Sequence, residues 1–180
     1  ACILMSKYLD FSYTLRMVTK TALLLIDIQK DYFPGGKYPL VNPLEAAKNA
    51  YMILQCFREH DCKHVHIQHI STKPGATLFI SGDRGTDIHD AVAHFEGEPI
   101  VYKHEPNAFL NTNLLELLKG WGIERVIVTG MMTHMCVDAT ARAASDLGCE
   151  VVLAEDACAT RDLKYGDTAI PTEHVHKSFL

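Results

Sequence analysis

Continuous apolar runs alternate with stretches of helical periodicity along most of this chain. The apolar runs predict strands at residues 22–27, 62–69, 99–103, 126–129 and 151–154. Apolar residues at three- and four-residue spacing predict helices at residues 43–60, 112–119, 134–147 and 173–180, with a short helical segment at 88–95. Because strands without polar alternation are typical of a sheet covered on both faces, we expect an α/β fold. The predicted architecture is a three-layer α/β/α domain around a doubly wound, mainly parallel sheet.

The length of 180 residues indicates one domain with a sizeable core. We place this single domain at residues 17–180, because Met17 stands just before the first strong strand, and we interpret residues 1–16 as an N-terminal extension. Neither a signal peptide nor a membrane-spanning run is recognisable in the sequence.

Charge and cysteine content narrow the possible partners and the location. With 17 basic and 22 acidic residues, the chain offers no electrostatic basis for binding nucleic acid or an anionic membrane. Its six cysteines show no CxxC spacing and no dense disulfide framework, so we expect a cytoplasmic protein. The expected partner is a small-molecule substrate.

Four polar side chains follow or end the predicted strands. Asp27 ends the first strand, His69 the second and Lys103 the third, and Cys136 comes shortly after the fourth. In a parallel sheet the carboxyl ends of the strands meet at one edge, where ligands bind. An acid, an ammonium group and a thiol at one edge predict a nucleophile device, with Asp27 as the base and Lys103 as a stabilising cation.

Cys136 is the predicted nucleophile, because a helical pattern follows it directly. A thiol in the first turn of a helix faces unpaired N–H groups and the positive end of the helix dipole, so we expect its thiolate form to be favoured. The other interpretation at this point is a small buried core residue, which is where most unpaired cysteines lie.

Three segments resemble the isochorismatase-like cysteine hydrolases, a family that includes nicotinamidases, carbamoylsarcosine amidase and ureidoacrylate amidohydrolase. They are ALLLIDIQKDYF at 22–33, VYKHEPNAF at 101–109 and TGMMTHMCV at 129–137. The resemblance covers roughly residues 20–160, in the family's order and spacing. It implies the Rossmann-like α/β/α fold and a catalytic triad of Asp27, Lys103 and Cys136.

The resemblance also implies a cis peptide bond between Met131 and Met132 and an oxyanion hole formed by the backbone N–H groups of Met132 and Cys136. The implied reaction is hydrolysis of a C–N bond in a small carboxamide or ureido compound through a thioester on Cys136. Relatives are usually oligomers, so we expect a homo-oligomer.

We expect neither a cofactor nor a metal ion. Family members that act on nicotinamide carry an Asp-x-His metal-binding pattern after the second strand, and here His69 and Ser71 take those two places. His64 and His69 are roughly 16 Å apart along a strand, and His66 and His69 face opposite sides, so these histidines cannot share one ion. We predict His69, Phe33, Phe109 and Thr133 as substrate-binding residues.

Three rival functions stay open. The first is isochorismatase-type cleavage of a vinyl ether by acid catalysis from Asp27, which needs no thiol. The second is a nicotinamidase, and the third is a non-enzymatic member of the family that binds a ligand or senses redox state.

Overall fold

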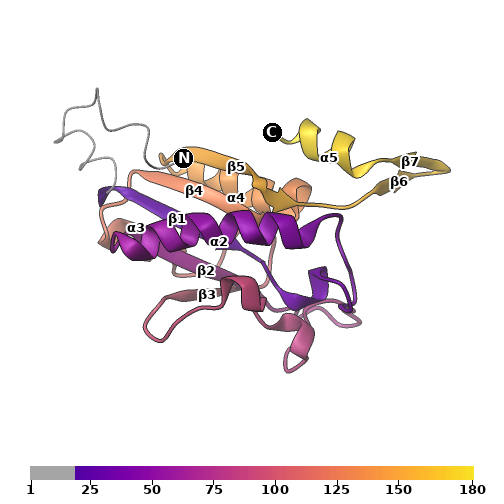
Figure 1. The fold of residues 1–180 in the computed structure, drawn as a ribbon, viewed down its shortest axis with the longest axis horizontal. Coiled ribbons are helices and arrows are strands. Elements are labelled where there is room, and N and C mark those ends of the chain that lie inside the picture. The colour runs from indigo at the N-terminus through magenta and orange to yellow at the C-terminus, as the bar shows by residue number, and fades with distance from the viewer. Residues whose placement is uncertain (1–18) are drawn as a thin grey trace.

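A five-stranded parallel sheet forms the centre of the molecule (Figure 1). The computed structural model describes residues 19–180. In spatial order the strands are β3 (Ile100–Lys103), β2 (Lys63–His69), β1 (Thr21–Ile26), β4 (Arg125–Met131) and β5 (Glu150–Ala159). Every neighbouring pair is parallel. All residues of the central β1 are buried, which is why this strand is apolar without alternation.

Helices cover both faces of the sheet. α2 (Pro43–Glu59) packs small residues such as Ala47 and Ala50 against one face. α3 (Leu114–Gly120) and α4 (Asp138–Asp146) cover the other face, where Leu114, Leu118 and Ala144 meet the opposite side of the strands. The prediction of a three-layer, doubly wound α/β/α domain is therefore confirmed.

Some predicted elements differ from the observed ones. The short helix expected at 88–95 is wrong: the chain forms only the 3₁₀ turn Asp90–Val92 there, after a separate 3₁₀ turn at Arg84–Thr86. The His89 side chain accepts the Ala91 N–H and so satisfies the single turn locally. The expected helix at 134–147 begins as a π-helical turn, Thr133–Val137, before α4.

The C-terminal region also differs from expectation. β5 runs on to Ala159, whereas the prediction ended at residue 154. It is followed by an antiparallel hairpin, β6 (Leu163–Tyr165) and β7 (Thr168–Ile170), which was not predicted. Three-residue strands are too short to produce a periodic pattern. The hairpin and α5 (Thr172–Ser178) extend to one side of the sheet in Figure 1.

Gly130 brings the end of β4 against the end of β1. Its φ angle is 125°, and a Cβ atom there would lie 2.0 Å from the Ile26 carbonyl oxygen. Only glycine allows this approach. Because Asp27 follows Ile26 and the Cys136 turn follows Met131, the contact places the two predicted catalytic segments side by side.

Two expectations concern the N-terminus and membranes. The extension placed at residues 1–16 lies outside the described residues. Among residues 19–180, no helix is long and apolar enough to cross a membrane.

Candidate active site

The carboxyl edge of the sheet brings the predicted acid, ammonium and thiol together. The Nζ atom of Lys103 lies 2.8 Å from Oδ2 of Asp27, and both side chains are fully buried. Cys136 is 5% exposed and lies close enough to both of them for their charges to act on its pKa. A carboxylate oxygen of Asp27, a ring nitrogen of His69 and the sulfur of Cys136 lie within 4.8 Å of one another.

Lys103 has three acceptors for its three ammonium protons. Besides Asp27, they are Nδ1 of His69 at 2.9 Å and the Glu105 carbonyl oxygen at 3.2 Å. Burial lowers the pKa of Lys103, but the negative charge of Asp27 acts in the opposite direction, and the net effect raises that pKa above its ordinary value. Lys103 is therefore a buried cation.

Cys136 lies in the π-helical turn at the start of α4. Burial and the nearby Asp27 carboxylate raise the pKa of Cys136 well above its ordinary value, although Lys103 acts in the opposite direction. The expectation of a resting thiolate is therefore wrong. Desolvation disfavours the charged form more than the helix terminus and the lysine favour it. The resting group is a thiol beside a carboxylate that can accept its proton.

The turn before Cys136 has the backbone geometry that the family resemblance implied. The peptide bond between Met131 and Met132 is cis. The Met132 carbonyl oxygen accepts the N–H groups of Met135 and Val137, at 3.0 and 3.3 Å, and is therefore directed into the turn that carries the thiol. The use of the Met132 and Cys136 N–H groups as an oxyanion hole stays a prediction.

Gln29, two residues after the acid, fastens β2 to the site. Its fully buried side chain accepts the His69 N–H at 2.8 Å and donates to the His69 carbonyl oxygen at 2.9 Å. A second donation, at 2.7 Å, reaches the Thr86 carbonyl oxygen. Gln29 thus fixes the backbone at His69 and at Thr86, a role that the sequence analysis did not predict.

Asp31 binds two backbone N–H groups of the neighbouring loops. Its buried carboxylate accepts the N–H of Phe79 at 2.9 Å and that of Lys37 at 3.2 Å. Phe79 in turn contacts the ring of Tyr32, with centroids 4.8 Å apart, and the ring of His69, at 5.7 Å. The roles of Gln29 and Asp31 follow from their burial, which the sequence alone does not show.

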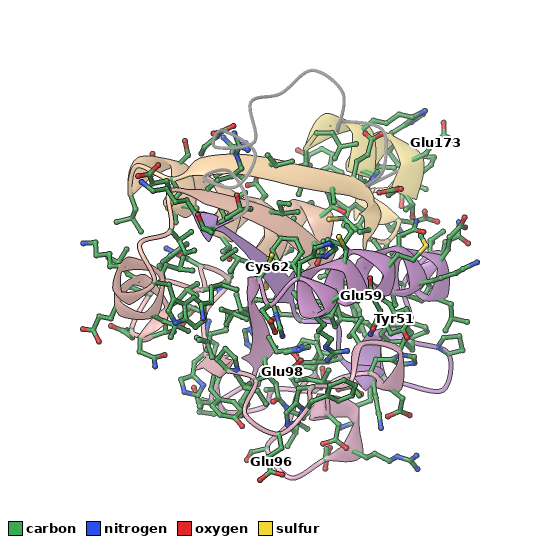
Figure 2. All side chains as sticks on the ribbon, turned by 60° about the vertical axis from the view of Figure 1, so that its left-hand side comes forward. Tyr51, Glu59, Cys62, Glu96, Glu98 and Glu173 are labelled. Atoms are coloured by element: carbon green, nitrogen blue, oxygen red, sulfur yellow. The ribbon has the colours of Figure 1, made fainter. Side chains whose placement is uncertain are left out.

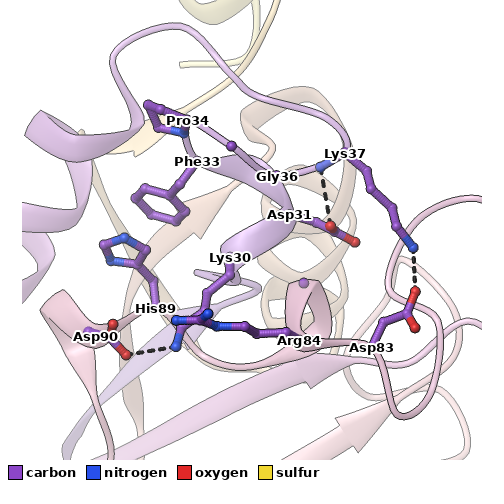
Figure 3. A pocket seen from close by; sticks show the side chains of 12 residues that line it. Lys30, Asp31, Phe33, Pro34, Gly36, Lys37, Asp83, Arg84, His89 and Asp90 are labelled. Atoms are coloured by element: carbon purple, nitrogen blue, oxygen red, sulfur yellow. Dashed lines mark hydrogen bonds and ion pairs between the residues drawn. The ribbon is translucent and has the colours of Figure 1, made fainter.

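The side chains of the remaining predicted binding residues are engaged in ring stacking, in packing or in a hydrogen bond. Phe33 is buried and stacks on His89, with ring centroids 3.6 Å apart. It lines a cavity of about 470 Å³ to which neither Asp27, Lys103 nor Cys136 contributes (Figure 3). Phe109 packs, partly buried, against the core on the α3 and α4 side. The buried Thr133 hydroxyl lies 2.8 Å from Nδ1 of His176 in α5.

Two groups of side chains have the spacing of metal ligands among the described residues. In the first, Asp27, His69 and Cys136, the Lys103 ammonium group already contacts two of the three members. The place of a cation there is therefore taken by the lysine.

The second group is His64, His66 and Glu98. Glu98 lies nearer the middle of the molecule than Glu96 in Figure 2. Arg58 of α2 binds both carboxylate oxygens of Glu98 at 2.7 Å. Although burial raises it, hydrogen bonds from Arg58, from the Phe95 N–H and from His64 lower the pKa of Glu98 to about 2. The guanidinium group neutralises the carboxylate, which makes this cluster an ionic link between α2 and β2.

The fold is a parallel α/β domain, and its site is a buried acid, ammonium group and thiol at one edge of the sheet. Together they define an isochorismatase-like protein. The isochorismatase domain family matches residues 21–172. Isochorismatase family protein YddQ of Bacillus subtilis is 47% identical over 162 residues, which are 89% of each chain. A streptothricin hydrolase of Streptomyces noursei is 34% identical over 79% of this chain and 55% of its own.

Solved structures agree with the sequence relatives. An isochorismatase from Pseudomonas putida superimposes with a TM-score of 0.83 at 34% identity, over 93% of this chain and 88% of that chain. The chain therefore belongs to the isochorismatase family, and it is a hydrolase of that family.

Proposed function

We propose that this hydrolase is a cysteine-dependent amidohydrolase that cleaves the C–N bond of a small carboxamide or ureido compound. The observation that carries the proposal is the buried Lys103–Asp27 ion pair, 2.8 Å long, against the Cys136 thiol. Vinyl-ether cleavage by acid catalysis uses a carboxyl group alone. A thiol beside that carboxylate is what covalent acyl transfer requires. The similarity to a streptothricin hydrolase also supports a hydrolytic reaction.

The mechanism begins with proton transfer from Cys136 to Asp27 as the sulfur attacks the carbonyl carbon. Two backbone N–H groups, those of Met132 and Cys136, stabilise the oxyanion. The C–N bond then breaks, and Asp27 returns the proton to the departing ammonia or amine. Water attacks the resulting thioester with Asp27 as base, the C–S bond breaks, and the thiol regains its proton as the acid leaves.

Lys103 has an electrostatic role in this sequence. Its charge stabilises the thiolate as the proton moves, and its ion pair with Oδ2 fixes one oxygen of Asp27. Because the ammonium group is buried and has three acceptors, it keeps one position through both halves of the reaction.

The proposal is tested with a panel of small amides and ureides, assayed for ammonia release. The Cys136→Ala variant is expected to lose all turnover and to keep its fold. Cys158→Ala is the matched control, since Cys158 is also buried and pairs with Gly130 at the same edge. Retention of a tenth of wild-type turnover in Cys136→Ala would exclude covalent catalysis and favour vinyl-ether cleavage. Loss of activity on chelation with EDTA would favour a metal-dependent nicotinamidase.

A further inference from the structure

His69 is the member of the site that meets solvent. Asp27 and Lys103 are fully buried and Cys136 almost so, whereas His69, at the last position of β2, is partly exposed. The imidazole is therefore more accessible to a substrate than the side chains of Asp27, Lys103 and Cys136. The ring lies between the Lys103 ammonium group and the Phe79 ring.

The hydrogen bond to Lys103 determines the tautomer of this imidazole. A lysine ammonium group only donates, so Nδ1 of His69, 2.9 Å from it, must be the acceptor. In a neutral ring the proton then stands on Nε2. Burial and the charge of Lys103 lower the pKa of His69 to about 4, which keeps the ring neutral at ordinary pH.

The Nε2–H group has no hydrogen-bonding partner within residues 19–180, and Gln29 holds the His69 backbone at both its N–H and its carbonyl oxygen. A fixed backbone and a fixed tautomer make this N–H a pre-oriented donor on the partly exposed member of the site. A carboxylate on the substrate would be repelled by Asp27, which lies within 4.8 Å of the imidazole. The donor therefore suits a neutral oxygen.

We propose that His69 is a specificity residue: Nδ1 receives a proton of Lys103, and the Nε2–H group binds a second carbonyl oxygen next to the scissile bond, as in an acylurea. This inference rests on the proposed function and names the class of substrate for that site. It also gives His69 a role distinct from metal ligation, because its Nδ1 lone pair is already used.

The tautomer is tested directly by ¹⁵N NMR of the histidine rings in the full chain. The His69→Asn spectrum assigns the resonances by difference. We expect a protonated Nε2, an unprotonated Nδ1 and no titration of His69 from about pH 5 to about pH 8, although Asp27, Lys103, His104 and Glu105 surround it. A protonated Nδ1, or titration near the ordinary pKa, would overturn the proposal.

Selectivity is tested by the rate at which two reagents alkylate Cys136, measured by mass spectrometry. N-(chloroacetyl)urea carries the second carbonyl oxygen, and N-isopropyl chloroacetamide has a similar shape without it. Each rate is divided by the rate of the same reagent with glutathione. We expect the preference of the wild type for the acylurea to fall about tenfold in His69→Asn, which keeps an acceptor near Lys103 and lacks the distal N–H.

His69→Gln is the conservative variant, because its amide nitrogen reaches the position of Nε2. It should keep most of the preference. An unchanged preference in His69→Asn, with Cys136 still alkylated, would overturn the role of His69 and leave the proposed function standing. Failure of both reagents to modify Cys136 in the wild type would overturn both.

Discussion

Two charged side chains act on the Cys136 thiol in opposite directions. Asp27 raises the pKa of Cys136, together with burial, and Lys103 lowers it. The site therefore stores the nucleophile as a thiol and supplies both the base and the cation needed to activate it. Burial also raises the pKa of the neighbouring Tyr32 well above its ordinary value, so that its phenol stays neutral.

The two charges predict opposite changes in thiol reactivity. At about pH 9, where an ordinary thiol is half ionised, Cys136 should react more slowly with iodoacetamide in Lys103→Ala than in the wild type. It should react faster in Asp27→Asn, because that change removes the negative charge. Both variants should nevertheless lose hydrolysis by about 10²-fold or more. Equal alkylation rates in the two variants would mean that neither charge acts on the sulfur.

The segment after β1 builds the wall of the site through alternate residues. Asp27 serves the thiol, Gln29 holds His69, and Asp31 holds Phe79 and Lys37. The bonds to His69 and Phe79 join parts of the chain that are 40 and 48 positions apart in sequence. Gln29 also donates to the Thr86 carbonyl oxygen in the first 3₁₀ turn, and the His89 N–H, just before the second turn, donates to the Ile28 carbonyl oxygen.

Asp31→Asn should therefore destabilise the protein. Both carboxylate oxygens accept backbone N–H groups, and the amide nitrogen of asparagine would face one of these donors. We expect a loss of about 1–3 kcal/mol in the free energy of unfolding, measured with urea. Asp83→Asn is the control, because Asp83 borders the cavity that Phe33 lines and is partly exposed, and because, among residues 19–180, its carboxylate pairs with the Lys37 side chain and with no backbone N–H (Figure 3). Equal stabilities of the two variants would contradict this role of Asp31.

Apolar runs and their polar ends predicted the sheet, its order of elements and the edge where Asp27, Lys103 and His69 meet. The strands and their ends could be predicted because a buried strand shows in the local sequence as a continuous apolar run, whichever strand it pairs with. The clamps made by Gln29 and Asp31 depend on residues 40 and 48 positions away. The protonation of Cys136 could not be predicted either, since it depends on the burial of the thiol. The position of Cys136 at a helix N-terminus predicted the thiolate, which is the opposite protonation state.

A second ionic cluster joins α2 to β2 through Glu98. Glu98 lies 2.9 Å from His64 and 3.3 Å from His66, and Arg58 binds it from α2. His66 is almost fully buried, with the His94 ring close to it. Burial lowers the pKa of His66 to about 4, although Glu98 acts to raise it.

The lowered pKa of His66 predicts acid sensitivity. As the pH falls below the ordinary histidine pKa, His66 binds a proton in the unfolded chain, whereas in the folded protein it stays neutral until about pH 4. Stability should therefore fall across this window by up to about 1.4 kcal/mol per pH unit from this side chain. In urea titrations from about pH 7 to about pH 4, His66→Gln should flatten the decline, and the exposed His174→Gln should not. A slope unchanged by His66→Gln would refute this assignment.

The covalent intermediate on Cys136 is the central claim. It is tested most directly by mixing the protein with p-nitrophenyl acetate, quenching in acid and locating any added acetyl group by mass spectrometry. We predict a burst of p-nitrophenolate and a thioester on Cys136 that hydroxylamine removes. The adduct should be absent from Cys136→Ala and present in Cys158→Ala. Turnover without any acyl group on Cys136, or an equal burst from Cys136→Ala, would contradict the account.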